Sequence, residues 1–166
     1  MACFDMPMLQ HASIHRSAGQ WPDNRAASAV TLDFEARHRR RIRLTLDNGE
    51  AILLDLPKAV AMSDGDGLQL EDGRWVRVQA SKERLVEIRH ADPAQLMRIA
   101  WHLGNRHLPA DISGSLLRIR PDHVIEGMLR GMGADLRTVA ASFQPEGGAY
   151  SGHSHSHHGS ETHHHG

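Results

Sequence analysis

The stretch Trp101-His102-Leu103-Gly104-Asn105-Arg106-His107-Leu108-Pro109 sets the organisation of the second half of the chain. Gly104 is the residue type that most often ends a helix in a left-handed conformation, and Pro109 restricts the backbone soon afterwards. The pattern predicts a helix that ends at Gly104, a tight turn, and a strand over 107–112. His107 would then be held by the backbone, as a metal ligand requires. A hydrogen-bonded surface or core histidine is the alternative.

Two amphipathic helices are predicted on either side of this strand. Asp92 is a typical N-cap and Pro93 a typical first helical residue. Apolar residues repeat at helical spacing in both segments: Leu96, Ile99, Ala100 and Leu103 in the first, then Ile125, Met128, Leu129 and Met132 in the second, which opens at Pro121 and ends at Gly133. The two methionines are expected in the core rather than on a metal.

Strand patterns at 84–89, 107–112, 116–120 and 134–141 complete this half. The order β-α-β-β-α-β is that of a ferredoxin-like fold. The sequence therefore predicts a ferredoxin-like domain over 84–150, in which metal binding is expected.

The first half shows the two-residue alternation of half-buried strands. Asn48-Gly49 and Asp72-Gly73 are turn signals between such strands, because both pairs tolerate positive φ. We predict a small all-β domain over 28–81, a linker at 81–83, and an irregular extension over 1–27. The predicted fold class is α+β.

Composition narrows the class of protein. Cys3 is the one cysteine, so a disulfide framework and a closed thiolate zinc site are excluded. No apolar run is long enough to span a membrane, and the first residues lack the layout of a signal peptide, so a cytoplasmic location is expected. The net charge of -1 argues against general binding to nucleic acid or to a membrane.

The basic run Arg37-His38-Arg39-Arg40-Arg41-Ile42-Arg43 has two interpretations. It could form a nucleic-acid patch, or it could be the solvated end of a hairpin with outward arginines. The second is favoured, because no aromatic residues are interleaved for base stacking.

The chain ends in a histidine-rich tract, residues 151–166, that is too polar to fold by itself and is expected to be disordered. Seven of the thirteen residues from 153 to 165 are histidine, namely His153, His155, His157, His158, His163, His164 and His165. Neutral imidazole suits Ni(II), with Zn(II) or Cu(II) as alternatives at the same ligands. A purification tag is the competing explanation, but the serine and glycine spacing differs from a plain hexahistidine.

His123 is a second candidate ligand on a folded element, at the first turn of the second helix. The positive end of the helix dipole disfavours an imidazolium there, so His123 should be neutral and available; a surface role is the alternative. His102 is expected to bond the last helix carbonyls instead. Asp111, Asp122 and Glu126 are nearby carboxylates for which surface solvation is expected. No catalytic motif accompanies them, so no catalytic residue or enzyme activity is expected.

Several segments together resemble the UreE family of urease accessory proteins. They are Trp101–His107, Leu117-Arg118-Ile119-Arg120-Pro121-Asp122-His123-Val124, Met128-Leu129-Arg130-Gly131 and Pro145-Glu146-Gly147-Gly148-Ala149-Tyr150, followed by the His-rich tail. The resemblance covers about 30–166. It implies a cytosolic homodimer that acts as a nickel chaperone, with a peptide-binding-like β domain and a ferredoxin-like domain. His107 of each subunit would share one nickel or zinc, the tail would add ligands, and urease would receive nickel with the help of a GTPase accessory protein.

Two departures from the family pattern are visible. Pro121 stands where some members have a second histidine, so a side site on this face should be weaker or absent. The first ~28 residues also run longer than expected. Two alternatives to nickel delivery stay open: a storage protein whose tail sequesters metal while its folded part binds partners, and a small metalloenzyme built on His107 and His123.

Overall fold

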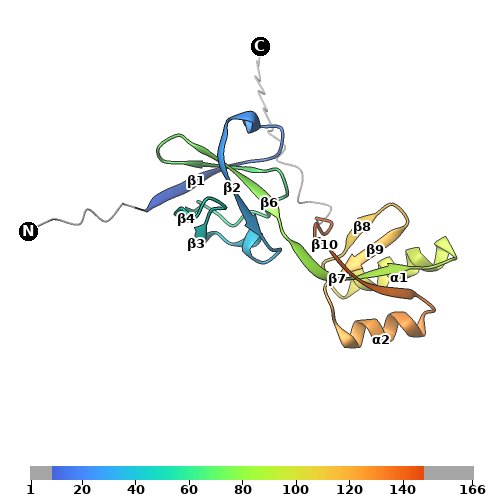
Figure 1. Ribbon diagram of the computed structural model, residues 1–166. Coiled ribbons are helices and arrows are strands. Elements are labelled where there is room, and N and C mark those ends of the chain that lie inside the picture. The colour runs from blue at the N-terminus through green and yellow to red at the C-terminus, as the bar shows by residue number, and fades with distance from the viewer. Residues whose placement is uncertain (1–8, 148–166) are drawn as a thin grey trace, which may run out of the picture.

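The computed structural model describes residues 9–147 and contains two sheets, one in each half of the chain (Figure 1). The first half contains β1 (Gln10–Arg16), η1 (Asp23–Arg25), β2 (Ala26–Leu32), η2 (Ala36–His38), β3 (Arg41–Thr45), β4 (Ala51–Asp55), β5 (Gly67–Leu70) and β6 (Trp75–Ala80). The second contains β7 (Lys82–Arg89), α1 (Pro93–Asn105), β8 (Asp111–Ser113), β9 (Leu116–Ile119), α2 (His123–Gly131) and β10 (Asp135–Ser142). None of the helices in this described part is long and apolar enough to cross a membrane.

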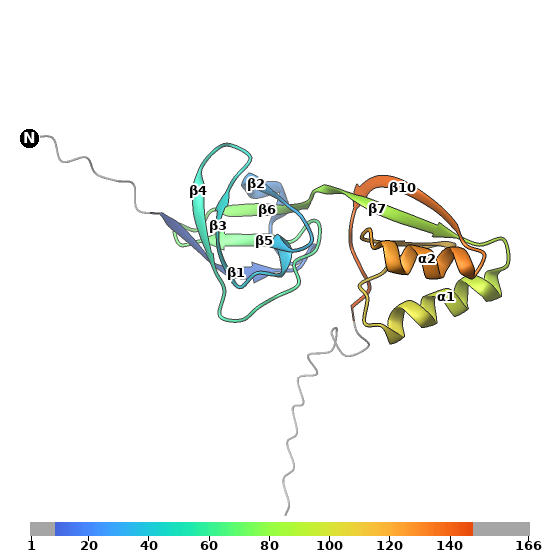
Figure 2. The same ribbon diagram turned by 90° about the horizontal axis from the view of Figure 1, so that it is seen from below.

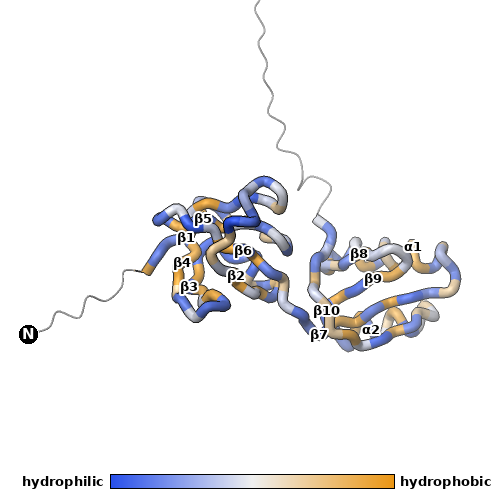
Figure 3. The backbone as a smooth tube through the Cα atoms, turned by 45° about the horizontal axis from the view of Figure 1, so that its top comes forward, coloured by the Kyte–Doolittle hydropathy of each residue, from blue (hydrophilic) through white to orange (hydrophobic). Residues whose placement is uncertain are grey.

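The first sheet has the order β2-β6-β5-β1-β4-β3. Its antiparallel hairpins, β3–β4 and β5–β6, turn at Gly49 and Gly73, whose φ angles are 89° and 86°. Both turn predictions are therefore confirmed. Alternating residues of the strands point into one apolar core, in which Ile52, Leu54 and Leu68 are fully buried. Figure 3 shows hydrophobic stretches along the strands of both sheets and hydrophilic ones at the loops between them.

The expected irregular extension over 1–27 is wrong for its second part. Residues 10–16 form β1, which pairs in parallel with β4 and antiparallel with β5 in the middle of the sheet. Only Ala12 of this strand is fully buried, so its sequence lacks the regular alternation that identifies the other strands. Residues 1–8, which include Cys3, lie outside the described residues.

The loop after β1 is fixed by a tryptophan that lies flat against the sheet. Trp21 donates a hydrogen bond from Nε1 to the carbonyl oxygen of Gly65 at 3.0 Å and stacks on Trp75. Gly67 lies beneath the indole, where a Cβ atom would overlap the ring. Glycine is therefore required at Gly67 by close approach and not by backbone angle.

The second sheet has the order β10-β7-β9-β8, and every neighbouring pair is antiparallel. With β7, β8, β9 and β10 as first to fourth strands, this is the 4-1-3-2 order of the predicted ferredoxin-like fold. Both helices cover the same face of the sheet (Figure 2). Their buried residues, Ile99 and Leu103 of α1 and Ile125 and Leu129 of α2, meet the strands in a second core. Met128 and Met132 pack against that core, as predicted.

The boundaries around α1 differ from the prediction. The helix continues through Gly104 to Asn105, and Gly104 does not adopt positive φ. The expected strand over 107–112 begins only at Asp111, and the expected linker residues Lys82 and Glu83 belong to β7. β10 pairs with β7 at eight positions, and this pairing extends β7 back to Lys82. The local sequence pattern alone could not predict it.

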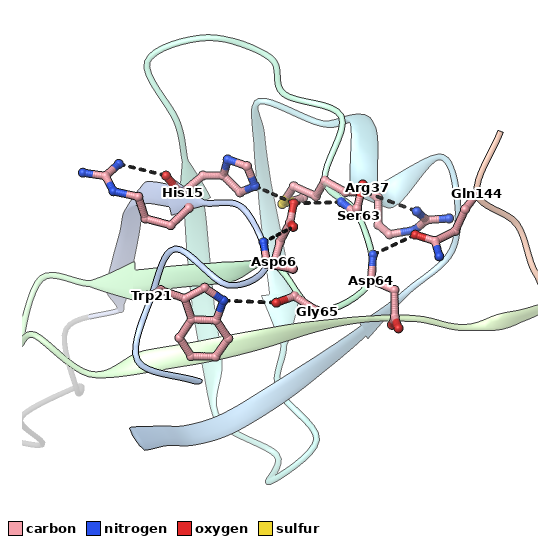
Figure 4. A network of polar contacts seen from close by, with 11 residues as sticks. His15, Trp21, Arg37, Ser63, Asp64, Gly65, Asp66 and Gln144 are labelled. Atoms are coloured by element: carbon pink, nitrogen blue, oxygen red, sulfur yellow. Dashed lines mark hydrogen bonds and ion pairs between the residues drawn. The ribbon is translucent and has the colours of Figure 1, made fainter. Parts of the chain in front are cut away.

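The two halves meet around a buried arginine (Figure 4). Arg37, 2% exposed, donates hydrogen bonds to the carbonyl oxygens of Met62 and of Phe143, the residue that follows β10. Phe34 packs edge-on against the Phe143 ring at a centroid distance of 5.1 Å. The expectation of outward arginines is therefore wrong for Arg37, which joins the first sheet to the end of the second, while Arg39 to Arg43 bear it out.

Candidate functional site

His107 lies on the turn that follows α1, with its side chain exposed. Its φ angle is 54°, the only positive value among the non-glycine residues of the described part. The backbone is held on both sides, because the His107 N–H bonds the carbonyl oxygen of Gly104 at 2.9 Å and the Leu108 N–H bonds that of Leu103 at 3.2 Å. A left-handed non-glycine residue often marks a functional constraint. His107 is thus on a rigid turn, although not on the strand that was expected.

His123 is the first residue of α2 and is also exposed. The preceding residue, Asp122, is the N-cap, and its Oδ1 accepts hydrogen bonds from the N–H groups of Val124 at 2.9 Å and Ile125 at 3.1 Å. This cap fixes the helix start and with it the position of the His123 backbone. The predicted placement at the first turn is confirmed; the role as a ligand stays a prediction.

One cavity lies between the two segments that carry these histidines. Its volume is about 270 Å³, and its lining includes Leu108 and Pro109 next to His107, and Pro121 and Asp122 next to His123. Residues that adjoin His107 and residues that adjoin His123 therefore border one hollow of the second domain. The structure thus brings both turns to the same cavity.

The end of the described chain is fastened to the segment that follows His107. The Glu146 N–H donates to the carbonyl oxygen of Ala110 at 2.8 Å, and Asp111 accepts a longer hydrogen bond, 3.4 Å, from the Gln144 N–H. His153 comes seven residues after Glu146 in the sequence, which corresponds to a reach of up to about 25 Å for an extended chain. The His-rich tract itself, including all seven of its histidines, lies outside the described residues.

The carboxylates near the site have structural partners. Asp122 caps α2, and Glu126 forms an ion pair with Arg130 at 3.2 Å. The expectation of surface solvation is wrong for Asp111, which is buried and also accepts a hydrogen bond from the Ser113 hydroxyl at 3.0 Å. Across residues 9–147, no group of three or more His, Cys, Asp or Glu side chains is arranged to hold a metal.

Exposed apolar side chains lie on the same domain, a feature that the sequence analysis missed. Met97 and Trp101 of α1 are 69% and 65% exposed, and Val124 of α2 is 65% exposed. Met97 and Trp101 are four residues apart, so they share one outward face of the helix. The sequence does contain this signal, because Met97 and Trp101 form a second apolar pair at helical spacing beside the core residues of α1. Large exposed apolar side chains in one region mark interaction surfaces.

Comparison with known proteins gives matches to both halves. The sequence pattern described as UreE urease accessory protein, N-terminal domain, matches residues 10–81, and that of the C-terminal domain matches residues 83–166. Urease accessory protein UreE of Bradyrhizobium sp. (strain ORS 278) is 55% identical over 132 residues, which are 80% of this chain and 63% of that protein. Urease accessory protein UreE of Chelativorans sp. (strain BNC1) is 52% identical over 145 residues, which are 86% of this chain and 92% of that protein.

The chain spans less than two thirds of the length of the Bradyrhizobium relative, but most of the Chelativorans one. The N-terminal match begins at residue 10, where β1 begins, in agreement with the place of that strand inside the first domain. A β domain, a ferredoxin-like domain and matches over both show that the chain belongs to the UreE family of urease accessory proteins.

Proposed function

We propose that this protein is a cytosolic, homodimeric metallochaperone that binds Ni(II) and delivers it for assembly of the urease active site. The observation that carries the proposal is His107, an exposed imidazole on a left-handed turn, close to the point at which the chain continues toward its His-rich tract. Imidazole nitrogen is a suitable ligand for Ni(II), and Zn(II) or Cu(II) would compete for the same atoms.

Residues 9–147 of one chain contain no group of three or more His, Cys, Asp or Glu side chains arranged to hold a metal, and a dimer brings further ligands. In a two-fold dimer each residue near the axis occurs twice, so a single His107 provides two imidazoles. Met97 and Trp101 offer an apolar surface on the helix that ends at this turn. We therefore place the dimer contact on the outward face of α1, with the shared metal between the two copies of His107.

The tail would complete the metal shell and exchange rapidly. Attachment of Glu146 to Ala110 keeps the start of the tail close to the His107 turn, which raises the effective concentration of tail imidazoles at the metal. His123 follows Asp122, which lines the cavity beside the His107 turn, and is a further ligand in this proposal. Binding by interchangeable imidazoles suits a protein that must transfer its metal to urease with the help of a GTPase accessory protein.

Nickel calorimetry combined with light scattering tests the proposal. The samples are the intact chain, the chain ended at Tyr150, and that shorter chain with His107→Ala. We expect the shortened chain to be a dimer that binds about one nickel ion per dimer, and His107→Ala to abolish that binding. His102→Ala in the same shortened chain is the matched control, since it removes a neighbouring imidazole on α1 and should leave binding unchanged.

Two outcomes would contradict the shared site. If shortening the chain already abolishes tight binding, the tail alone carries the metal, and storage by the tail becomes the better description. If Trp101→Asp leaves both the mass of the dimer and the nickel stoichiometry unchanged, the contact is not on this face of α1. Imidazole ligation further requires that nickel is released as the pH falls below about 6.5, because protonated imidazole cannot bind metal.

A further inference from the structure

The cavity between the His107 turn and the start of α2 has a mainly apolar wall. Most of the residues that line it are apolar, namely Leu108, Pro109, Ile119, Pro121 and Ile125. Its volume of about 270 Å³ is large enough to admit an aromatic side chain. Covering such a surface with a further apolar group is favourable, because it removes apolar area from water. The cavity is therefore suited to a large apolar side chain.

The two charged residues of the lining narrow the chemistry of the occupant. Asp122 uses Oδ1 for both hydrogen bonds of the α2 cap, and its Oδ2 accepts none from residues 9–147. Arg120 is engaged elsewhere, because it forms an ion pair with Glu35 at 2.9 Å. The rim thus presents a carboxylate oxygen as an acceptor. An apolar ring that carries a hydroxyl donor, as in tyrosine, matches both the wall and the rim.

The last described residues bring the chain to this cavity. The Glu146 N–H donates to the carbonyl oxygen of Ala110 at 2.8 Å, and Ala110 directly follows Pro109 of the lining. Tyr150, which lies outside the described residues, comes four positions after Glu146, a reach of up to about 13 Å for an extended chain. The tyrosine is therefore close enough in sequence to enter the cavity of its own chain.

The composition after β10 selects the same residue. Tyr150 is the only tyrosine of the protein and the only aromatic or large aliphatic side chain in residues 144–166, where the remainder are small, polar or proline. A second copy of the chain could instead offer Trp101, which is 65% exposed. That side chain lies on the outward face of α1, however, which is needed for the proposed dimer contact.

We propose that the cavity holds the side chain of Tyr150 from the same chain. The ring packs against Leu108, Ile119 and Ile125, and the phenol hydroxyl donates to Oδ2 of Asp122. Tyr150 is thereby a positioning residue for the His-rich tract, since His153 follows three positions later, within about 10 Å along the chain. This consequence for the metal rests on the proposed function, whereas the docking of Tyr150 does not.

NMR of the full chain without metal tests the docking. The methyl groups of isoleucine and leucine are labelled, and nuclear Overhauser effects from the one tyrosine ring are recorded. We expect effects between that ring and the methyl groups of Leu108, Ile119 and Ile125, and a change in their chemical shifts in Tyr150→Ala. Tyr150→Phe should keep the ring contacts, because it loses only the hydroxyl.

A variant of the cavity wall and a matched control separate docking from general effects. Pro109→Asp places a carboxylate in the lining and should abolish the ring contacts. Ile112→Asp introduces the same charge at a 49% exposed apolar residue nearby that is not in the lining, and should leave them unchanged.

Nickel titration of the same full-length variants tests the positioning role. Tyr150→Ala should weaken binding at the primary site about tenfold, because the tail imidazoles lose effective concentration there, and Tyr150→Phe should restore most of the affinity. If the ring contacts are present but nickel affinity is equal in Tyr150→Ala, the positioning role is overturned and the docking stands.

Three results would overturn the docking itself. The first is the absence of ring contacts with the cavity methyl groups, even if nickel binds at His107 as proposed. The second is equal loss of the contacts in Pro109→Asp and Ile112→Asp. The third is ring contacts that arise only between labelled and unlabelled subunits of a mixed dimer, since the tyrosine would then occupy the cavity of a second copy.

Discussion

Replacing Arg37 should weaken the first domain and its connection to the end of the second sheet. Arg37→Met keeps much of the side-chain length but leaves the carbonyl oxygens of Met62 and Phe143 without their donor. Each buried acceptor left unpaired costs about 1–3 kcal/mol. Burial lowers the pKa of the Arg37 guanidinium despite the nearby carboxylates, and its Nε is buried with no partner, so removal of the charge recovers part of that loss. The net loss should be about 2–4 kcal/mol in the free energy of unfolding.

Urea denaturation followed by far-UV circular dichroism measures this loss. Arg39→Met is the matched control, because Arg39 is exposed in the same run and its replacement should change the free energy of unfolding by less than about 0.5 kcal/mol. The NMR signals of Phe143 and Gln144 should also change in Arg37→Met, since that contact holds them to the first domain. A stability loss no larger than that of Arg39→Met would refute the assigned role of the buried guanidinium.

Three smaller changes test other parts of the structure. Asp122→Ala removes the cap of α2 and should lower the free energy of unfolding by about 1 kcal/mol, with Asp122→Asn restoring most of it in thermal denaturation. Gly67→Ala would overlap the Trp21 ring, so the tryptophan must move; near-UV circular dichroism should change, and unchanged spectra would contradict the packing. Burial tends to raise the pKa of Asp66, but hydrogen bonds from His15 and two backbone N–H groups outweigh it and hold that pKa below its usual range. A depressed carboxyl pKa stabilises the fold above the unfolded value of about 3.9, and this stabilisation is lost as the pH falls through the folded pKa. Asp66→Asn should therefore flatten the acid side of a pH–stability curve, and an unchanged slope below about pH 4 would count against the contact.

Much of the second domain follows from local pattern. The Asp92 cap and the helical spacing from Leu96 to Leu103 specify α1, because a helix forms its hydrogen bonds within one segment and buries one stripe. The hairpin turns at Gly49 and Gly73 are equally local. The strand β1 could not be predicted in this way. Its pairing partners lie about 40 or more residues away, and one buried residue in seven leaves almost no alternation to detect.

The candidate site, too, was predicted only in part from the sequence. The sequence identified His107 and His123 as histidines next to helix boundaries. It placed the left-handed conformation at Gly104, however, whereas the hydrogen bonds that end α1 impose it on His107. The sequence analysis also expected Asp111 to be solvated, although the segment that follows β10 contacts it through Gln144. Which residues border one cavity depends on how β9 and the helices pack, and this packing is not encoded by any single segment.

The sequence by itself therefore determined most element types apart from β1, the ferredoxin-like order, the family and the candidate metal ligands, since these follow from short segments of the chain. Only the tertiary structure decided that Arg37 is buried between the halves and that β1 lies in the middle of the first sheet. It also decided that Glu146, near the end of the described residues, is bonded to Ala110 in the segment after His107. These features arise from contacts between distant segments, whose free energy depends on burial and pairing in the folded chain and not on local preference.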